Sequence, residues 1–454
     1  MIPNSAPGNS RHSSFSVNER SKSVKALLPL NIDYPVDVAE HPKAARPFGK
    51  VTNFGDTNQG WLSVAHEELE LHSHTFDKEK FTLKILDQLL LPHITEYVDV
   101  ESVEDAYQVI KKMQVRGAPL IATVGMLGLI VDLRHRVHNL HVMSTAEFLE
   151  FVTEKCDMLV SARPTAINLA NIIGELKQLL RVLFDEFGAE VLKIEDDGIR
   201  NEESEAAERK DRVLTIRSKI ESFVLDWQAK EREENNLLIR NSVTALTHAV
   251  SSRKLVVLTI CNTGSLATSS YGTALGVIVH LHKLGHLQTA LALETRPYNQ
   301  GSRLTTYELA AYKVPHLLLT DSMAAYAMKT YKIDAVLVGA DQVALNGDTA
   351  NKIGTYMLSV LAAYHRVPFY VVTPTSSINP RITTGSEIRV EERPQIELIR
   401  FNGALTAPSD CPVWNPAFDI TPAALITAIL TEKGNFEPEN LPNALLESQN
   451  PDFI

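Results

Sequence analysis

Cysteine is scarce in this sequence, and long apolar runs are missing from it. Cys156, Cys261 and Cys411 are the only cysteines among 454 residues. So few thiols make no disulfide framework and are typical of a reducing compartment. No apolar run reaches the length of a membrane-spanning helix, and the first residues lack the apolar centre of a signal peptide. We therefore expect a cytoplasmic protein without a membrane partner.

An excess of positive charge is also missing. Lys and Arg number 44, Asp and Glu number 55, and the net charge is −11. This balance disfavours nonspecific nucleic-acid binding, although a local basic pocket remains compatible with it. With 44% hydrophobic and 22% charged residues, the composition is that of a globular protein long enough for two or three domains.

The usual nucleotide and metal motifs are absent. The sequence has no G-x-x-x-x-G-K-[ST] loop, no G-x-G-x-x-G after the first predicted strand of its later half, and no Cys/His cluster with zinc-ligand spacing. The stretch HEELELHSH, from His66 to His74, places Glu70 where a zincin helix needs its second His, so we interpret it as a polar strand or loop. We therefore expect neither cofactor nor metal, and acid–base or thiol chemistry on a small polar molecule.

Composition shifts divide the chain into three parts. Residues 1–78 are predicted to be a mostly disordered extension, because Ser, Pro, Asn and charged residues dominate much of this range. Residues 79–250 form a smaller mixed α/β domain that is largely helical. Its charged stretch at residues 195–212 reads as a solvated insertion. Residues 251–454 form a second, Rossmann-like domain.

In this second domain, short β-rich runs alternate with helical stretches. The runs are residues 254–260, 289–295, 316–320, 334–341 and 368–375. Such alternation predicts right-handed crossovers and a parallel sheet with helices on both faces. The fold class is therefore α/β, and a ligand is expected beyond the carboxyl ends of the strands.

Polar or reactive groups follow all five predicted strands. They are Cys261, Asn262, Thr263 and Gly264 after the first, Glu294, Thr295, Arg296, Asn299 and Gln300 after the second, Asp321 and Asp341 at the next two, and Thr373 and Thr375 after the last. Because a parallel sheet gathers these ends at one edge, we expect them to line a pocket. Taken singly, Cys261 is compatible with a buried packing thiol and Asp341 with a turn residue.

Several cationic residues suit an anionic substrate, among them Arg303 and Lys352. Arg116 and Gly117 lie between two predicted helices, where a guanidinium fork and free backbone N–H groups can bind an anion. Asn351 and Lys352 are predicted to open another helix. A lysine there is unfavourable to the helix dipole, and a bound anion would explain it.

Ordered sequence blocks now identify a resemblance. They are VRGAPLIA, RPTAINLA, CNTGSLAT, ETRPYNQGSRLTTYEL, VGADQVALNGDTANKIGTY and YVVTPTSSI. Together, from about residue 81 to about residue 435, they closely resemble the methylthioribose-1-phosphate isomerases, which are aldose–ketose isomerases of methionine salvage. The same fold family contains the regulatory subunits of translation initiation factor 2B and the ribose-1,5-bisphosphate isomerases, which remain the alternatives. Ile260 departs from the pattern, since many members have His there.

The resemblance implies specific roles and partners. Cys261 and Asp341 match the catalytic pair, with Asp341 as the proton donor. The matched substrate contacts are Arg116, Gly117, Ala118, Arg163, Gln300, Asn351 and Lys352. The implied reaction converts 5-methylthio-D-ribose 1-phosphate to 5-methylthio-D-ribulose 1-phosphate, an intramolecular oxidoreduction without a cofactor. A homodimer is implied as well, and a nuclear location beside the cytoplasmic one.

Overall fold

The computed structural model describes residues 71–136, 143–163, 167–194, 202–249, 253–401 and 403–442. Residues 1–70 of the predicted extension and residues 195–201 of the predicted insertion lie outside these ranges. The chain divides into two compact units, one of residues 1–42 and 392–415 and the other of residues 43–391 and 416–454. The predicted domain boundary at residue 250 does not coincide with this division and stays a prediction.

An antiparallel three-stranded sheet opens the described chain. Its strands are β1 (His74–Asp77), β2 (Thr82–Leu86) and β3 (Tyr97–Val100), in that order. Leu83, Ile85 and Val100 are almost fully buried in the core beneath the sheet. Strand β1 lies within residues 1–78, so regular structure begins a few residues before the predicted end of the extension.

Helices α3 (Val103–Lys111) and α4 (Ala118–His135) follow this sheet. Ser102 caps α3 as its spacing from Asp105 predicts, since its hydroxyl accepts from the Asp105 amide at 3.1 Å. The second helix is apolar nearly all round and is mostly buried, as expected. Among the described helices it alone is long and apolar enough to cross a membrane by composition, a test that core helices also pass.

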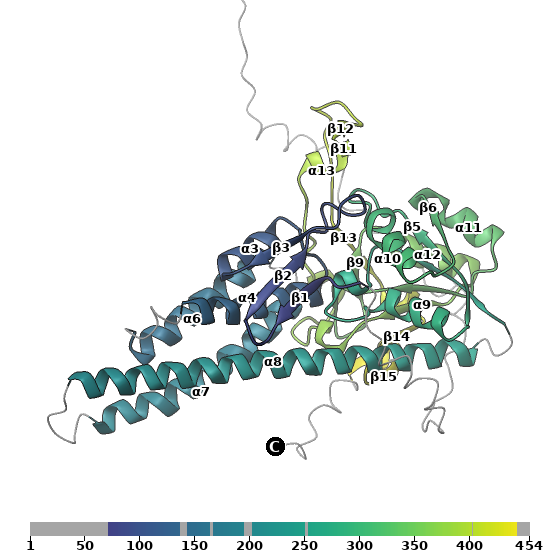
Figure 1. Cartoon of the computed structure of the whole chain (residues 1–454). Helices are drawn as coiled ribbons and strands as arrows, with labels where there is room; N and C mark the ends of the chain where they lie inside the picture. The colour runs from purple at the N-terminus through teal and green to yellow at the C-terminus, as the bar shows by residue number, and fades with distance from the viewer. Residues whose placement is uncertain are drawn as a thin grey trace, which may run out of the picture. The chain divides into compact units, whose positions relative to one another are not determined.

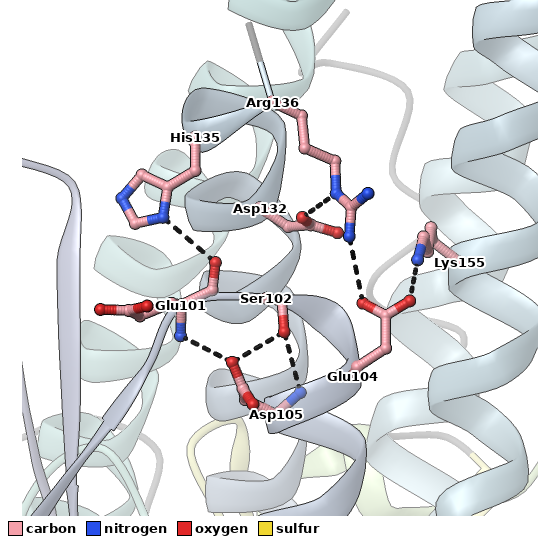
Figure 2. Close-up of polar contacts among 8 residues, drawn as sticks. All are labelled: Glu101, Ser102, Glu104, Asp105, Asp132, His135, Arg136 and Lys155. Atoms are coloured by element: carbon pink, nitrogen blue, oxygen red, sulfur yellow. Dashed lines mark hydrogen bonds and ion pairs between the residues drawn. The ribbon is translucent and has the colours of Figure 1, made fainter. Parts of the chain in front are cut away.

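A polar cluster ties α3 to the end of α4 and to α6 (Thr145–Ala162) (Figure 2). Glu104 of α3 pairs with Lys155 of α6 and, at 3.5 Å, with Arg136, which follows α4. Arg136 in turn pairs with the buried Asp132 one helical turn before it. The cluster fixes three helices against each other at the rim of their apolar core.

Two long helices complete this layer. Helix α7 (Ile167–Ile194) packs against α4 and α6, and α8 (Glu202–Ala249) lies beside them (Figure 1). The predicted charged insertion is therefore helical from Glu202 onward, because α8 begins there. Beyond it, Val213, Ile216 and Ile220 form an apolar stripe that is buried in the core with α4.

The main sheet has seven strands in the order β15-β14-β10-β7-β4-β5-β6. They are β4 (Leu255–Thr259), β5 (Leu287–Leu293), β6 (His316–Leu319), β7 (Ala335–Val338), β10 (Phe369–Val372), β14 (Ala428–Thr431) and β15 (Gly434–Phe436). All neighbours are parallel except β14 and β15. The five predicted strands are thus confirmed as one parallel sheet, and β14 and β15 add two strands that were not predicted.

Helices cover both faces of this sheet, as predicted for an α/β fold (Figure 1). The helices are α9 (Ala274–Lys283), α10 (Thr306–Ala311), α11 (Ala324–Thr330) and α12 (Thr355–His365). Alternate residues of β4 face opposite cores: Val257 packs with α9 and the last part of α8, whereas Val256 and Leu258 pack with α11 and α12. This period of two is the mark of a strand buried on both faces.

A second small sheet corrects one prediction. Strands β8 (Gln342–Val343), β9 (Thr349–Lys352) and β13 (Phe418–Thr421) pair antiparallel in the order β13-β9-β8. Asn351 and Lys352 therefore end a strand rather than open a helix, and α12 begins only after Gly354. The other compact unit contributes α13 (Gln395–Ile399), β11 (Arg400–Phe401) and β12 (Ala404–Leu405).

Candidate active site

A cavity opens at the carboxyl ends of β4 and β7. About 400 Å³ along its walls, part of it open to solvent, is free of atoms. Its walls come from residues 116–119 at the start of α4, from residues 261–263, 267, 268 and 273 after β4, from residues 339–341 after β7, and from Asn351, Pro374 and Ser377. The chain runs outward from β4 to β5 and β6 on one side, then returns to β7 on the other. Ligands bind at such switch points in open α/β sheets.

Six of the nine predicted site residues line this cavity. They are Arg116, Gly117, Ala118, Cys261, Asp341 and Asn351. Lys352 lies close by, since the charges of Cys261 and Asp341 act on the pKa of its ammonium. Arg163 and Gln300 are not part of the cavity wall.

Cys261 is held in an unusual backbone conformation. Its φ of 69° lies in the left-handed region, which is uncommon for a residue with a side chain. Two hydroxyls fix the turn: Thr295 Oγ1 accepts from the Cys261 amide at 2.9 Å, and Thr305 Oγ1 donates to its carbonyl at 2.5 Å. The thiol is 5% exposed and lines the cavity. Backbone strain of this kind gathers at functional sites.

Arg116 contacts the same turn through its guanidinium. Nη1 donates to Asn262 Oδ1 at 2.8 Å and Nη2 to the Asn262 carbonyl at 2.9 Å. Nη2 also lies 3.6 Å from the sulfur of Cys261. The guanidinium therefore contacts both Asn262 and the sulfur at the mouth of the cavity.

Gly117 allows α4 to begin directly at the cavity. Its φ is 92°, and a Cβ built there would lie 2.4 Å from the Ala267 carbonyl oxygen. No side chain caps the N-terminus of α4. Because a helix N-terminus carries partial positive charge and free N–H groups, this elbow suits a phosphate, as the sequence predicts.

Asp341 and Lys352 have pKa shifts in opposite directions. Burial raises the pKa of the Asp341 carboxyl, while the nearby Lys352, Arg163 and Arg116 charges oppose that shift. Burial also lowers the pKa of Lys352, which lies 4.7 Å from the centroid of the Phe418 ring. A carboxyl with a raised pKa keeps its proton closer to neutral pH and can serve as an acid.

Asp419 supports the segment that carries Asn351 and Lys352. It pairs with Asn351 across β13 and β9. Its carboxylate accepts from the Gly354 amide at 2.7 Å and the Tyr356 amide at 3.0 Å, which caps α12. Burial raises its pKa from 3.8 to about 6. The sequence did not single out Asp419, because its partners lie more than sixty residues earlier.

The remaining predicted contacts lie behind the cavity wall. Arg163 follows the last residue of α6 and donates to Glu391 at 3.1 Å. Its charge still acts on Asp341. Gln300 is 1% exposed, and its Oε1 has no hydrogen-bond partner among the described residues.

Arg303 does not serve the pocket as the sequence suggested. Its Nη1 donates to the carbonyls of Gln88 and Leu91, each at 3.0 Å, so it fixes the loop after β2. Asp321 accepts from the amides of Thr295 and Arg296 at 2.9 and 2.8 Å. It therefore shapes the turn after β5, which in turn holds Cys261.

Glu308 of α10 is the main site residue that the sequence missed. It is 1% exposed, and its carboxylate accepts from Asn262, Ser265 and Leu266 in the turn after β4. The sequence offered one sign of its burial: Glu308 is a single acid between Tyr307 and Leu309 in a helix otherwise rich in apolar residues. No group of three or more potential metal ligands gathers in the described part of the chain.

Comparison with known proteins now places the chain in a family. The initiation factor 2 subunit family matches residues 114–438. The chain belongs to this family. Over 387 residues it is 48% identical to the methylthioribose-1-phosphate isomerase of Caenorhabditis elegans. The aligned region covers 85% of this chain and 94% of that protein.

Two solved structures share the fold. The 5-methylthioribose 1-phosphate isomerase of Pyrococcus horikoshii OT3 is 32% identical, with a TM-score of 0.66, over 83% of this chain and 96% of its own. The translation initiation factor eIF-2B, subunit delta, of A. fulgidus is 33% identical, with a TM-score of 0.62, over 83% of this chain and 99% of its own. The resemblance inferred from the sequence blocks, and the mixed α/β fold with a parallel sheet, are therefore confirmed.

Proposed function

We propose that this chain is an aldose–ketose isomerase that converts 5-methylthio-D-ribose 1-phosphate to 5-methylthio-D-ribulose 1-phosphate in methionine salvage. One observation carries the proposal. A thiol, Cys261, and a carboxyl, Asp341, line one cavity together with the uncapped N-terminus of α4. The high identity to isomerases bearing this name supports it.

The substrate's phosphate explains why both kinds of group are needed. Phosphate on the anomeric oxygen prevents the sugar ring from opening freely, so a proton must be supplied to the ring oxygen. Asp341 suits this step, because burial raises its pKa. Such general acid catalysis typically contributes about 10²–10⁴-fold. The N–H groups at Gly117 and Ala118 would hold the phosphate.

Hydrogen must then move from C2 to C1. Cys261 stands beside the same cavity, with Arg116 Nη2 3.6 Å from its sulfur. A thiolate there can accept a proton or stabilise charge on the sugar. Deuterium from solvent appearing at C1 of the product would indicate a proton transfer, and its absence would indicate a hydride shift.

A neighbouring hollow favours the methylthio sugar over a bisphosphate. It shares Asp341 with the cavity, and its walls include the apolar side chains of Ala350, Ile388, Val390 and Phe418. Arg389 is the cation on that wall. Because a second phosphate needs several donors or charges, a wall with one cation and the Gln342 amide beside four apolar side chains suits a methylthio group better.

Parallel kinetics on the two sugars test this function. The purified full-length chain should form ketose from 5-methylthioribose 1-phosphate with a much higher kcat/KM than from ribose 1,5-bisphosphate. The opposite preference would favour the bisphosphate isomerase. No turnover of either sugar, together with capture of initiation factor 2B subunits, would favour a regulatory subunit, a role that requires no thiol–carboxyl pair.

We also propose that the active form is a homodimer. Large apolar side chains are exposed on one side of the sheet, over β6, α11, α12 and their flanks. They are Leu317, Leu318, Met323, Tyr326, Tyr331, Tyr356, Met357, Val360 and Tyr364. Helices α11 and α12, which carry several of these side chains, pack against each other. Apolar surface of this kind typically marks a protein–protein interface. The cytoplasmic and nuclear locations remain predictions.

A further inference from the structure

The carboxylate of Glu308 is buried without a direct ion-pair partner among the described residues. Its oxygens accept from four donors: Asn262 Nδ2 at 2.6 Å, the Ser265 amide and hydroxyl at 2.7 Å each, and the Leu266 amide at 3.2 Å. Gly264 makes this approach possible, since a Cβ there would lie 2.2 Å from Glu308 Oε2. An unpaired buried carboxylate is costly, so its presence calls for a reason.

The bond from Asn262 to Glu308 sets the orientation of the Asn262 amide. With Nδ2 turned to the carboxylate, Oδ1 faces the other way and accepts from Arg116 Nη1 at 2.8 Å. A reversed amide would direct its N–H groups at the guanidinium, which only donates hydrogen bonds. Glu308 therefore determines which face of Asn262 meets Arg116, although it does not contact Arg116 itself.

Arg116 is thereby aligned with the thiol. The Asn262 side chain and carbonyl bind both terminal nitrogens, and Nη2 then reaches to 3.6 Å from Cys261. The negative charge of Glu308 also lies one amide away from the guanidinium, which partly offsets the burial of both. Burial raises the pKa of Glu308 while its four donors oppose the shift.

We propose that Glu308 is a positioning residue, which acts through Asn262 to hold the Arg116 guanidinium beside Cys261 and the phosphate-binding elbow. This inference rests on the proposed isomerase function for its catalytic consequence, whereas its effect on the thiol can be measured without turnover. The alternative is that Glu308 anchors only the backbone of the turn, through Ser265 and Leu266.

An exchange of amide and carboxylate separates these two roles. In Glu308→Gln one acceptor oxygen becomes an NH2 group, so it must face the N–H of either Asn262 or Ser265, and kcat/KM should fall about 10–100-fold, the usual loss when a group supporting a site residue is removed. Asn262→Asp should do the same, because two carboxylates then oppose each other. The double variant restores one N–H···O bond and keeps an acceptor for Arg116. It should recover to within about tenfold of the original kcat/KM.

The thiol supplies the readout that is independent of turnover. In a Cys411→Ser background, iodoacetamide should alkylate Cys261 at a rate that depends on the Arg116 guanidinium 3.6 Å from its sulfur, since Cys156 is fully buried. The rate at neutral pH should fall severalfold in each single variant and return in the double variant. Glu147→Gln, the same change at an exposed capping carboxylate of α6, should leave both rates unchanged.

Three results would overturn the proposal. They are an unchanged alkylation rate in Glu308→Gln, a double variant as slow as the singles, or a recovery that follows melting temperature alone. Should Glu308→Gln fail to fold, Asn262→Ala removes the link to Arg116 and leaves the turn anchored, so unchanged alkylation in that variant would be equally decisive. Absence of turnover in the unmodified chain would instead contradict the isomerase function, and the alkylation rates would still test the positioning.

Discussion

Cys261 and Asp341 follow β4 and β7, two strands that pair in parallel through Val257 with Ala335 and Leu258 with Val336. The chain places these strands about eighty residues apart, yet the sheet makes them neighbours. Both side chains therefore reach the cavity from a rigid framework rather than from one flexible loop. Such a framework suits groups that must keep a fixed separation during a proton transfer.

Removing either reactive group should abolish most of the turnover. We expect Cys261→Ser and Asp341→Asn each to lower kcat by about 10²–10⁴-fold, because each removes an acid, base or charge from the reacting centre. Steady-state assays of ketose formation measure this. Cys411→Ser, a thiol outside the cavity, is the matched control and should keep full activity. Full turnover in either site variant would exclude the assigned role.

The Gly117 elbow should not tolerate a side chain. We expect Gly117→Ala to destabilise the fold by more than about 1 kcal/mol, because its positive φ and the close Ala267 carbonyl both oppose a Cβ. Denaturant unfolding measures the change, and kcat/KM should fall as the elbow shifts. Gly174→Ala, in α7 with open space around it, should instead stabilise by about 0.5–1 kcal/mol. Equal effects at the two glycines would argue against the strain.

Asp419 should make stability fall as pH rises. Its pKa is raised from 3.8 to about 6, so its favourable contribution is complete below pH 3.8 and is lost as pH increases through about 6. A shift of about two units corresponds to roughly 3 kcal/mol at most. Between pH 4 and 7, the free energy of unfolding of the unmodified chain should therefore fall relative to that of Asp419→Asn. Denaturation curves at several pH values test this, and parallel pH profiles would contradict it.

The exposed apolar surface over α11 and α12 should control oligomeric state. Tyr356, Met357, Val360 and Tyr364 share one face of α12. The double change Val360→Asp with Tyr364→Asp should convert a dimer to a monomer, because it places charge in an apolar contact. Light scattering after size exclusion measures the mass.

The control for this prediction lies on α7. Val182 is 60% exposed there, away from the proposed interface, and Val182→Asp should leave the mass unchanged. A monomeric unmodified chain, or a dimer that survives the double change, would contradict the assigned surface.

The sequence predicted the site best where pattern and position coincide. The five strands were evident because buried parallel strands read as short apolar runs bounded by turns, and the groups after them then had to meet at one edge. Strand β14 was not predicted, because it lies far along the chain from β10, the strand with which it pairs. Lys352 was misassigned because residues 351–361 have a helical composition, whereas pairing with Phe418 makes it the end of a strand.

Individual supporting residues were beyond such reasoning. Glu308 and Asp419 are single acids whose partners are backbone amides and two side chains, Asn262 and Ser265, brought from other segments. The apolar neighbours of Glu308 in its helix were a weak sign, and Asp419 had none. Their roles follow from burial, from their hydrogen bonds and, for Glu308, from the close approach that Gly264 permits.

Helix α8 runs uninterrupted for 48 residues, from Glu202 to Ala249, or about 70 Å at 1.5 Å per residue. Its Ile216 is buried in the core that holds α4, and its Leu246 is buried in the core under the sheet. One continuous helix thus connects the core that holds α4 with the core under the sheet. We therefore expect a hinge motion between these two cores to require bending or unwinding of α8.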